Sequence, residues 1–313
     1  MTNKWSITQV EGFEAWIGET GRLSITVIPA LGGKAISLRS KAADREWLWR
    51  SGKPLGNKGL GSPFGEGDES GWDEMFPGIN ACHYPEEPWQ GHSVPDHGEA
   101  WALPWTAELQ RDALLCRVEG RNFPYTLEKV YTFTDGDTIR IDYSVTNRSE
   151  SPFSFLWAAH PLLQASEGMR IRVPEGMERI EVSYSAEERL GVFGDRRRWP
   201  HAGEGVDLSV VEAASGRYAE KYYFEGKVVQ GWAELLDPVT EEAITFRFPP
   251  EQVPYLAVWA NYGGYGDCYH VALEPATGRM DDLAHAMKRG EAAVVEAGGR
   301  YEWFLEVDVR QRN

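Results

Sequence analysis

The chain has 313 residues, of which 42% are hydrophobic and 26% are charged, and its formal net charge is −16. This composition is typical of a globular protein and not of a disordered one. The negative charge argues against a nucleic-acid partner, because neutralising phosphates requires clustered Lys and Arg, and equally against an anionic membrane surface. The 13 Trp and 13 Tyr residues suit both the filling of large sheets and the stacking of flat faces on sugar rings.

The sequence predicts a cytoplasmic protein without a membrane partner. Residues 1–12 (MTNKWSITQVEG) lack the apolar core of a signal peptide, and no stretch approaches the roughly 18 apolar residues of a membrane span. Cys82, Cys116 and Cys268 are odd in number and widely spaced, which favours reduced thiols over a disulfide framework. Nothing in the sequence indicates an oligomeric state.

Short strand-like runs make up most of the chain. In order, they are Ile25–Ala30, Leu114–Val118, Tyr125–Thr134, Ser154–His160, Lys221–Phe224, Val228–Leu235, Ala243–Phe248, Tyr255–Asn261 and Cys268–Glu274, with a last alternating run from Tyr301 to Val309. The clearest signal is a hairpin within Tyr125–Arg148, where apolar and polar residues alternate on either side of a turn at Asp135-Gly136-Asp137. Many short strands separated by Gly, Pro and Asp predict an antiparallel, all-β sandwich. Because we find no linker and no repeat, we expect a single domain over residues 1–313.

One segment has the spacing of a helix. In Met280–Lys288, apolar residues recur at intervals of three and four, and Gly290 follows as a C-terminal cap. Two glycine-rich stretches, Gly52–Gly71 and Tyr262–Asp267, lack the strand-to-helix context of a phosphate-binding loop. A loop as long as the first is uncommon without a function, so it favours the rim of a site.

The run Cys268–Glu274 (CYHVALE) presents one apolar face and one face with chemistry. Its alternation places His270, Ala272 and Glu274 together, and the small alanine leaves room for a ligand. Pro275 follows at once, so Glu274 ends its strand, where sites are easily built. A solvated carboxylate remains the alternative interpretation.

Histidines supply the second candidate group. His160 ends the apolar run SFLWAAH, where it serves either as a core histidine bonded to the backbone or as an acid–base group near neutral pH. His97 lies in PDHGEAW, between a Pro-Asp turn and a glycine. A metal site of His97, His160 and Glu274 is an alternative, but such sites usually take two ligands from one strand or turn, and no HxH or HxxxH pair exists.

Two basic segments are weaker candidates for contacts with a charged substrate. Arg196–Arg198 in DRRRWP can clamp a phosphate or sulfonate, although a solvated loop is the more common role of such a run. Lys221 heads the strand-like run KYYF and is comparable.

Five motifs, taken in order, resemble those of the aldose 1-epimerase (galactose mutarotase-like) superfamily. They are VIPALGGKAISLRS with REWLW (residues 27–40 and 45–49), GWDEMFPGI (71–79), PDHGEAW (95–101), WAAHPLL (157–163) and ALEPATG (272–278). Each motif is weak alone, but their order and spacing across most of the chain make the resemblance fairly specific. It implies a β-supersandwich of large antiparallel sheets that binds a carbohydrate on a concave face.

The resemblance also implies catalytic roles. Enzymes of this superfamily use a glutamate as general base on the anomeric hydroxyl, which matches Glu274, and a histidine as general acid toward the ring oxygen, which matches His160. A second histidine near the ring matches His97. Opening a pyranose requires proton removal at O1 and proton delivery at O5, so two groups of opposite protonation must flank one ring. No cofactor and no metal are implied.

The sequence departs from the galactose-type enzymes in the residues that read the sugar. Asp73 or Glu74 of GWDEMFP lies in the region of a sugar-binding Arg, and Lys221 lies at about the distance before Glu274 where those enzymes carry a sugar-binding Asp. We therefore expect Asp73 and Lys221 to help bind an unidentified aldose, phosphorylated and sulfonated sugars included.

The predicted function is thus an aldose 1-epimerase (mutarotase)-like isomerase, with Glu274 and His160 as catalytic residues. We expect its partner to be a small sugar, contacted by His97 and by Trp259 as well. A carbohydrate-binding protein without turnover and a metal-dependent sugar enzyme are the alternatives.

Overall fold

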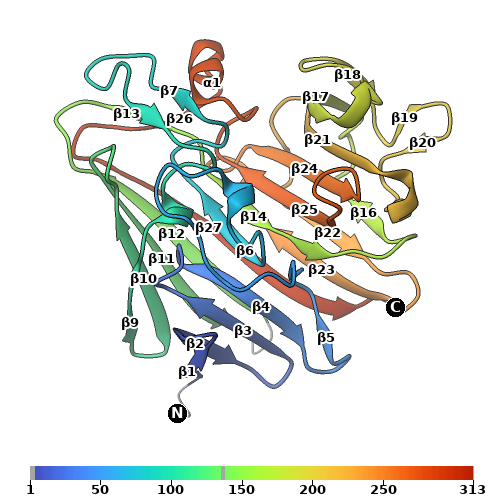
Figure 1. Cartoon of the computed structure of the whole chain (residues 1–313), viewed down its shortest axis with the longest axis horizontal. Helices are drawn as coiled ribbons and strands as arrows, with labels where there is room; N and C mark the ends of the chain where they lie inside the picture. Colours follow the sequence, from blue (N-terminus) through green and yellow to red (C-terminus); the bar gives the residue numbers. More distant parts are fainter. Residues whose placement is uncertain (1–3, 135–137, 313) are drawn as a thin grey trace.

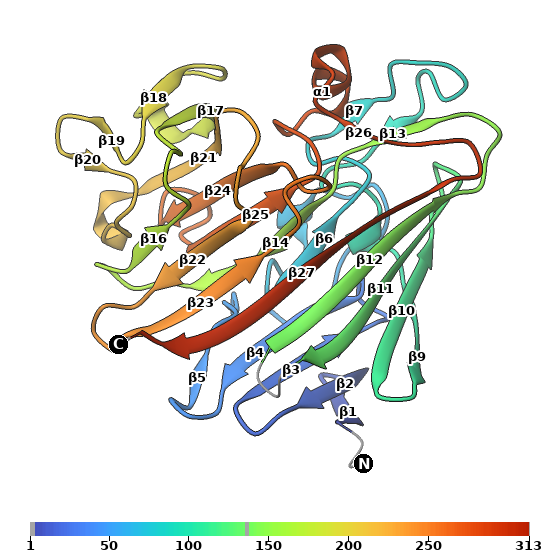
Figure 2. The same ribbon diagram turned by 180° about the vertical axis from the view of Figure 1, so that it is seen from behind.

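The computed structural model describes residues 4–134 and 138–312, so the turn expected at Asp135-Gly136-Asp137 lies outside the described residues. Two large sheets of antiparallel strands are stacked face to face. Figure 1 shows the larger sheet in front, and Figure 2 shows the second sheet from behind. This arrangement confirms the predicted all-β sandwich. No helix in the described ranges is long and apolar enough to cross a membrane.

The larger sheet has 13 strands and holds the strands that build the site. Its main path runs β1 (Trp5–Val10), β2 (Phe13–Glu19), β3 (Leu23–Ile28), β4 (Lys34–Ser40), β6 (Trp72–Met75), β14 (Ala158–Pro161), β25 (Tyr269–Ala276), β24 (Tyr255–Tyr262), β21 (Tyr218–Phe224), β17 (Arg179–Ser185) and β18 (Arg196–Arg198). Two short strands lie off this path, β5 (Arg45–Glu46) beside β4 and β15 (Leu163–Gln164) beside β25.

The second sheet has eight strands and covers one face of the first. Its order is β16 (Arg170–Arg172), β22 (Trp232–Leu236), β23 (Glu242–Arg247), β27 (Arg300–Gln311), β12 (Thr138–Asn147), β11 (Tyr125–Thr134), β10 (Ala113–Glu119) and β9 (Thr106–Gln110). The predicted hairpin is confirmed, because β11 and β12 pair from Tyr125↔Asn147 to Thr134↔Thr138.

The remaining elements are short. Three two-stranded pairs are β7 (Cys82–His83) with β8 (Ser93–Val94), β13 (Phe153–Phe155) with β26 (Ala293–Val295), and β19 (His201–Gly203) with β20 (Val206–Asp207). Single 3₁₀ turns lie at Phe64–Glu66, Ala100–Ala102, Ala186–Glu188 and Ala214–Gly216, and the described residues form one α-helix, α1 (Leu283–Arg289).

Alternation along the strands divides the larger sheet into a core face and an outer face. On β25, Val271 and Leu273 are fully buried in the main core cluster, while His270 and Glu274 point to the other side and line a cavity. Because successive strand residues face opposite sides, the core contacts of Val271 and Leu273 determine where Glu274 points. The sandwich thus positions the site on the face of the larger sheet that the second sheet leaves free.

A buried polar network joins the two sheets through Glu74. Lys129 of β11 donates to Glu74 Oε1 at 3.2 Å and to the carbonyl of Gly33 at 2.6 Å. Tyr143 and Trp157 donate to the same carboxylate at 3.0 and 2.9 Å. Since Glu74 points into the core, it is not available to bind a sugar on the outer face.

Three local expectations differ from the structure. The helix begins at Leu283 and not at Met280, because Asp282 caps it by accepting from the backbone N–H of His285, while Met280 has a left-handed backbone. The run Ser154–His160 is divided between β13 and β14, which belong to different sheets. The strand expected at Val228–Leu235 begins only at Trp232.

Candidate active site

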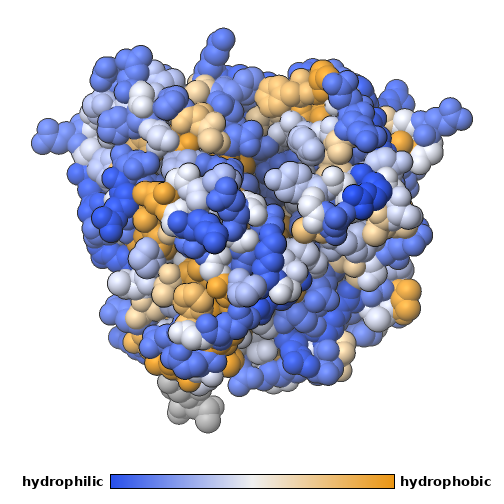
Figure 3. Space-filling view, viewed as in Figure 1, coloured by the Kyte–Doolittle hydropathy of each residue, from blue (hydrophilic) through white to orange (hydrophobic). Residues whose placement is uncertain are grey.

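A cavity of about 320 Å³ lies on the outer face of the larger sheet. Strands β14, β21, β24 and β25 supply its floor, and the stretches Gly52–Gly71 and Tyr262–Asp267 contribute to its rim through Phe64, Gly65, Glu69 and Tyr265. The first stretch therefore lies at the edge of a cavity, which agrees with the position expected for it. The surrounding surface in Figure 3 is mainly hydrophilic, with hydrophobic side chains in small groups.

Five of the six expected site residues line this cavity: Glu274, His160, His97, Lys221 and Trp259. The register of the sheet explains why they meet. Trp259 lies opposite both Lys221 of β21 and Ala272 of β25, while Glu274 lies one row further along the same face. Neighbouring rows on one face are two residues apart, which is about 7 Å.

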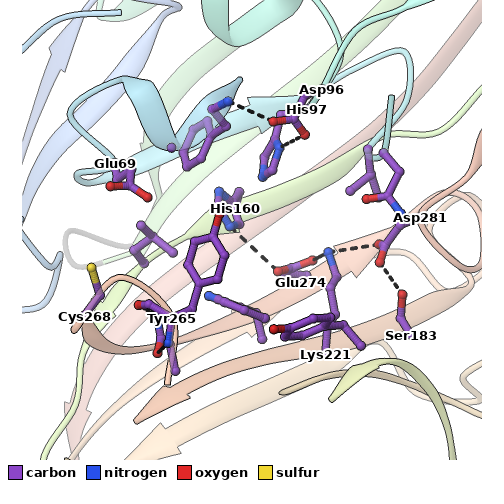
Figure 4. Close-up of a pocket in the computed structure, with 18 of the residues that line it drawn as sticks. Glu69, Asp96, His97, His160, Ser183, Lys221, Tyr265, Cys268, Glu274 and Asp281 are labelled. Atoms are coloured by element: carbon purple, nitrogen blue, oxygen red, sulfur yellow. Dashed lines mark hydrogen bonds and ion pairs between the residues drawn. The ribbon is translucent and has the colours of Figure 1, made fainter. Parts of the chain in front are cut away.

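Glu274 and His160 form the centre of the cavity (Figure 4). His160 Nε2 lies 4.0 Å from Glu274 Oε1, and both residues are almost fully buried, with 5% and 0% of their surface exposed. Burial raises the pKa of the Glu274 carboxyl, although Lys221 opposes the rise. Burial also lowers the pKa of His160 well below its usual value, and the nearby ammonium group of Lys221 lowers it further. The pair therefore combines a carboxylate of increased basicity with an imidazole that gives up a proton readily.

Lys221 connects Glu274 to a second carboxylate, Asp281. Lys221 Nζ lies 2.7 Å from Glu274 Oε2 and 3.0 Å from Asp281 Oδ1. Burial alone would lower the pKa of Lys221, but the two carboxylates outweigh it and raise the pKa above its ordinary value. Asp281 in turn accepts from Tyr223 Oη at 2.8 Å and from the hydroxyl of Ser183. Lys221 is thus held as an ammonium ion and is not a nucleophilic amine.

His97 lies above His160, and its position depends on a neighbouring glycine. Its ring stacks on Phe64 at a centroid distance of 4.2 Å, and its Nδ1 is 2.8 Å from Asp96 Oδ1. A contact with Asp96 at Nδ1 leaves Nε2 for other partners. Gly98 has a left-handed backbone, and a Cβ there would lie 2.1 Å from the carbonyl oxygen of Phe76. The glycine of this His-Gly motif is therefore required by a close backbone approach.

Asp73 is the expected residue that does not line the cavity. It is 1% exposed and lies opposite His160 on the neighbouring strand β6. Lys34 Nζ lies 3.3 Å from Asp73 and 2.5 Å from Asp68, so Lys34 bridges two buried carboxylates. Burial raises the pKa of Asp73 to about 6, against the effect of Lys34. The geometry supports a role beneath the histidines and not the direct sugar contact that we expected.

Sequence reasoning missed two polar residues of the cavity. Asp281 falls within the expected helix Met280–Lys288, so the sequence gives no sign that its carboxylate lies between Lys221 and Ser183. His270 was placed on the correct face of β25 but had no recognisable partner in sequence, because its partner Trp259 belongs to the adjacent strand. Cross-strand pairs of this kind depend on a register that the sequence does not specify.

The basic run and the metal alternative have less support. Arg196 pairs with Glu225 and Arg197 with Asp195, and no residue of the run lines the cavity. Within residues 4–134 and 138–312, no group of three or more His, Cys, Asp or Glu is arranged to hold a metal ion. The three cysteines of the described chain are free thiols.

Comparisons with known proteins agree on fold and family. The Slr1438 protein of Synechocystis sp. PCC 6803 is 18% identical, the match covers 94% of this chain and 96% of that chain, and the TM-score is 0.69. A galactose mutarotase related enzyme of Lactobacillus acidophilus is 13% identical, with 95% of this chain and 97% of that chain covered and a TM-score of 0.70. A galactose mutarotase-like protein of Lactobacillus casei ATCC 334 is 18% identical, with 95% of this chain and 100% of that chain covered and a TM-score of 0.70. At these identities, the likeness shows the fold alone. No curated protein matches the sequence.

A family model gives the more specific match. The model described as aldose 1-epimerase matches residues 19–192, which include His97 and His160 but not Glu274. The match covers more than half of the 313 residues. The chain therefore belongs to the aldose 1-epimerase family.

Proposed function

We propose that this protein interconverts the α and β anomers of an aldose by general acid–base catalysis. The observation that carries the proposal is the 4.0 Å separation of His160 Nε2 and Glu274 Oε1 at the floor of a cavity. The hydroxyl oxygen O1 and the ring oxygen O5 are bonded to the same carbon, so the groups that serve them must be close neighbours.

In the proposed reaction, the Glu274 carboxylate accepts the proton of O1 while His160 delivers a proton to O5. The C1–O5 bond breaks, C1 and O1 form the aldehyde, and rotation about C1–C2 followed by ring closure gives the other anomer. Closure returns the proton to O1 and restores His160. The raised pKa of Glu274 and the lowered pKa of His160 favour both transfers. The steps require only side chains of this chain, so we propose that no cofactor takes part.

The charge of the cavity favours a neutral sugar over a phosphorylated or sulfonated one. Its lining includes four carboxylates, from Glu69, Asp96, Glu274 and Asp281, and one lysine. That lysine, Lys221, is already paired with two of the carboxylates. An anionic substrate group would therefore meet uncompensated negative charge, which is costly in a partly enclosed site.

The test is NMR exchange spectroscopy between anomers of neutral, acidic, phosphorylated and sulfonated aldoses. We expect acceleration for at least one neutral aldose, and a loss of about 100-fold in Glu274→Gln, as is typical of a general base. Glu69→Gln is the matched control, because Glu69 lines the same cavity but pairs with Lys53 at the rim. Exchange should survive treatment with EDTA.

Two results would contradict the proposal. Undiminished exchange in Glu274→Gln would remove Glu274 from the role of base. Sugar binding without acceleration for any sugar in the panel would favour a carbohydrate-binding protein.

A further inference from the structure

Pairing between four strands of the larger sheet places four ionisable side chains in one row. The register of β4 with β6 sets Lys34 opposite Asp73, and that of β6 with β14 sets Asp73 opposite His160. The register of β14 with β25 sets His160 opposite Glu274. Residues that lie opposite each other on antiparallel strands point to the same face, with Cβ atoms about 4.5–5.5 Å apart. Asp73 is therefore the direct neighbour of His160 on the side away from Glu274.

The contacts of this row are made at both ends and are open in the middle. Lys34 Nζ lies 3.3 Å from Asp73 Oδ2, and His160 Nε2 lies 4.0 Å from Glu274 Oε1. Between these contacts, Asp73 Oδ1 and His160 Nδ1 are buried atoms without a hydrogen-bond partner among the described residues. Buried polar groups are nearly always hydrogen-bonded, and the hydrogen bonds of an active site are often long before substrate binds. Two unpaired atoms on facing side chains are therefore suited to each other.

The orientation of the His160 ring directs Nδ1 toward Asp73. The two nitrogens of an imidazole ring point to nearly opposite sides, and Nε2 is the nitrogen close to Glu274. Nδ1 therefore points to the side of the row on which Asp73 lies. A neutral imidazole has one donor and one acceptor, and a carboxylate can only accept. An ionised Asp73 thus favours the tautomer that carries its proton on Nδ1 and leaves Nε2 for the sugar.

The proposed reaction requires such a partner for His160. When His160 delivers its Nε2 proton to O5, the neutral ring keeps the other proton on Nδ1, and this buried N–H group needs an acceptor. Before delivery the ring is an imidazolium ion, whose burial is costly without a nearby negative charge. Burial raises the pKa of Asp73 to about 6, against the effect of Lys34, so this carboxylate is largely ionised near neutral pH. Asp73 does not line the cavity, so it acts on a sugar only through His160.

The other charged groups around this pair do not take the place of Asp73. Those that act on the pKa of His160 from neighbouring elements are His97, Lys221, His270 and Lys34, with Glu274 at Nε2. Those that act on Asp73 are Lys34, Asp68 and His97. Asp68 accepts from Lys34 and from the backbone N–H groups of Gly56 and Ser70. Among these groups, Asp73 is the carboxylate on the Nδ1 side of His160.

We propose that Asp73 is the positioning residue of His160. Asp73 Oδ1 accepts from His160 Nδ1–H, which holds the ring with Nε2 toward the sugar, and the negative charge of Asp73 stabilises the imidazolium ion. Lys34 holds the carboxylate in place from the far side of the row. This inference rests on the proposed function for the direction of proton transfer, whereas the orientation and the tautomer of His160 do not depend on turnover.

The experiment combines ¹⁵N NMR of the histidine side chains with anomer exchange of glucose and galactose. The chain has seven histidines, and His160→Gln identifies the signals of His160. In the wild type we expect the His160 proton on Nδ1 near neutral pH, and Asp73→Asn should remove this preference. The same variant should slow exchange about tenfold with KM nearly unchanged, because a general acid typically contributes about 100-fold or more and Asp73 does not line the cavity. Loss of the negative charge should also lower the pKa of His160, so the decline of the rate with rising pH should move to lower pH.

Asp68→Asn is the matched control, because it also removes a buried carboxylate from Lys34 but leaves the residue that faces His160. It should keep the His160 tautomer and the pH profile, and an equal change of the tautomer in both variants would overturn the inference. So would a wild-type His160 that carries its proton on Nε2. If the tautomer depends on Asp73 but neither sugar is exchanged, the positioning role stands and the proposed function loses support. If a sugar is exchanged equally fast in Asp73→Asn, the positioning role is overturned and the proposed function stands.

Discussion

Replacing Lys221 by methionine should raise the pKa of Glu274 and make both activity and stability depend on pH in a new way. The ammonium lies 2.7 Å from the carboxylate, and at an effective dielectric constant of about 20 this attraction amounts to about 6 kcal/mol. Removing one partner of a buried ion pair typically costs about 3–5 kcal/mol. Lys221 is the main cation that opposes the effect of burial on Glu274, while Asp281 raises the pKa further.

The consequence for activity is a loss that is largest near neutral pH. Without the attraction of Lys221, the pKa of the Glu274 carboxyl rises and its protonated fraction increases, so exchange should fall about tenfold or more at pH 7, and the difference from the wild type should shrink toward pH 9. Lys221→Arg retains the charge and should keep a pH profile closer to that of the wild type. Asp281→Asn removes the neighbouring negative charge, so it should lower the pKa of Glu274 and weaken the base.

The consequence for stability has the opposite dependence on pH. A carboxyl whose pKa is higher in the folded chain than in the unfolded chain binds its proton more tightly when folded. The stabilisation that this carboxyl contributes is therefore fully present below its pKa in the unfolded chain, and it is lost as the pH rises through its pKa in the folded chain. Urea unfolding should find Lys221→Met close to the wild type at pH 5 and about 3–5 kcal/mol less stable at pH 8. A difference that does not vary with pH, together with an unchanged activity profile, would refute the idea that Lys221 controls Glu274.

Two further predictions concern protonation and the core. The exchange rate should fall as the pH rises through neutrality, because burial lowers the pKa of His160 and the proposed acid must carry a proton; a rate that rises from pH 6 to pH 8 would exclude imidazolium as the acid. Lys129→Met should lower the free energy of unfolding by about 3–5 kcal/mol, because it leaves the buried carboxylate of Glu74 without its cation. Lys41→Met is the control, because it removes a half-exposed ion pair, and it should lower the free energy of unfolding by no more than about 1 kcal/mol in the same denaturation experiment.

The sequence predicts those parts of the site that depend on a single strand. Alternation in CYHVALE is sufficient to place Glu274 and His270 on one face, because the core contacts of Val271 and Leu273 allow only one orientation. Alternation also predicts that Asp73 and Glu74 face opposite sides of their strand, but not which one faces the core. That choice depends on Lys129, whose partner is 55 residues away in sequence and lies on the other sheet.

The parts that the sequence does not predict depend on how strands pair. A bulge shifts the register between Val182 and Tyr184, and as a result Ser183 and Tyr184 both line the cavity although they are adjacent in sequence. No single-strand pattern contains this information. The partnership of Lys221 with Asp281 is equally hidden, because Asp281 belongs to a turn that precedes α1 and resembles the first residues of a helix.

Strand pairing also explains why membership of the family is more informative about the reaction than about the sugar. In the proposed reaction, Glu274 and His160 act on O1 and O5, which every cyclic aldose possesses, so a motif that preserves them implies anomeric chemistry without selecting a substrate. The other hydroxyl groups of the sugar must be distinguished by neighbouring side chains on the same face of the sheet, such as Lys221 and Trp259. These side chains belong to β21 and β24, which lie outside the sequence motifs that contain Glu274 and His160. In this chain the neighbouring row contains an ammonium ion that is already paired with two carboxylates. If the proposed function holds, we expect substrate selection to depend on the hydrogen-bonding groups of that row that remain unpaired, and we expect neutral sugars to be preferred.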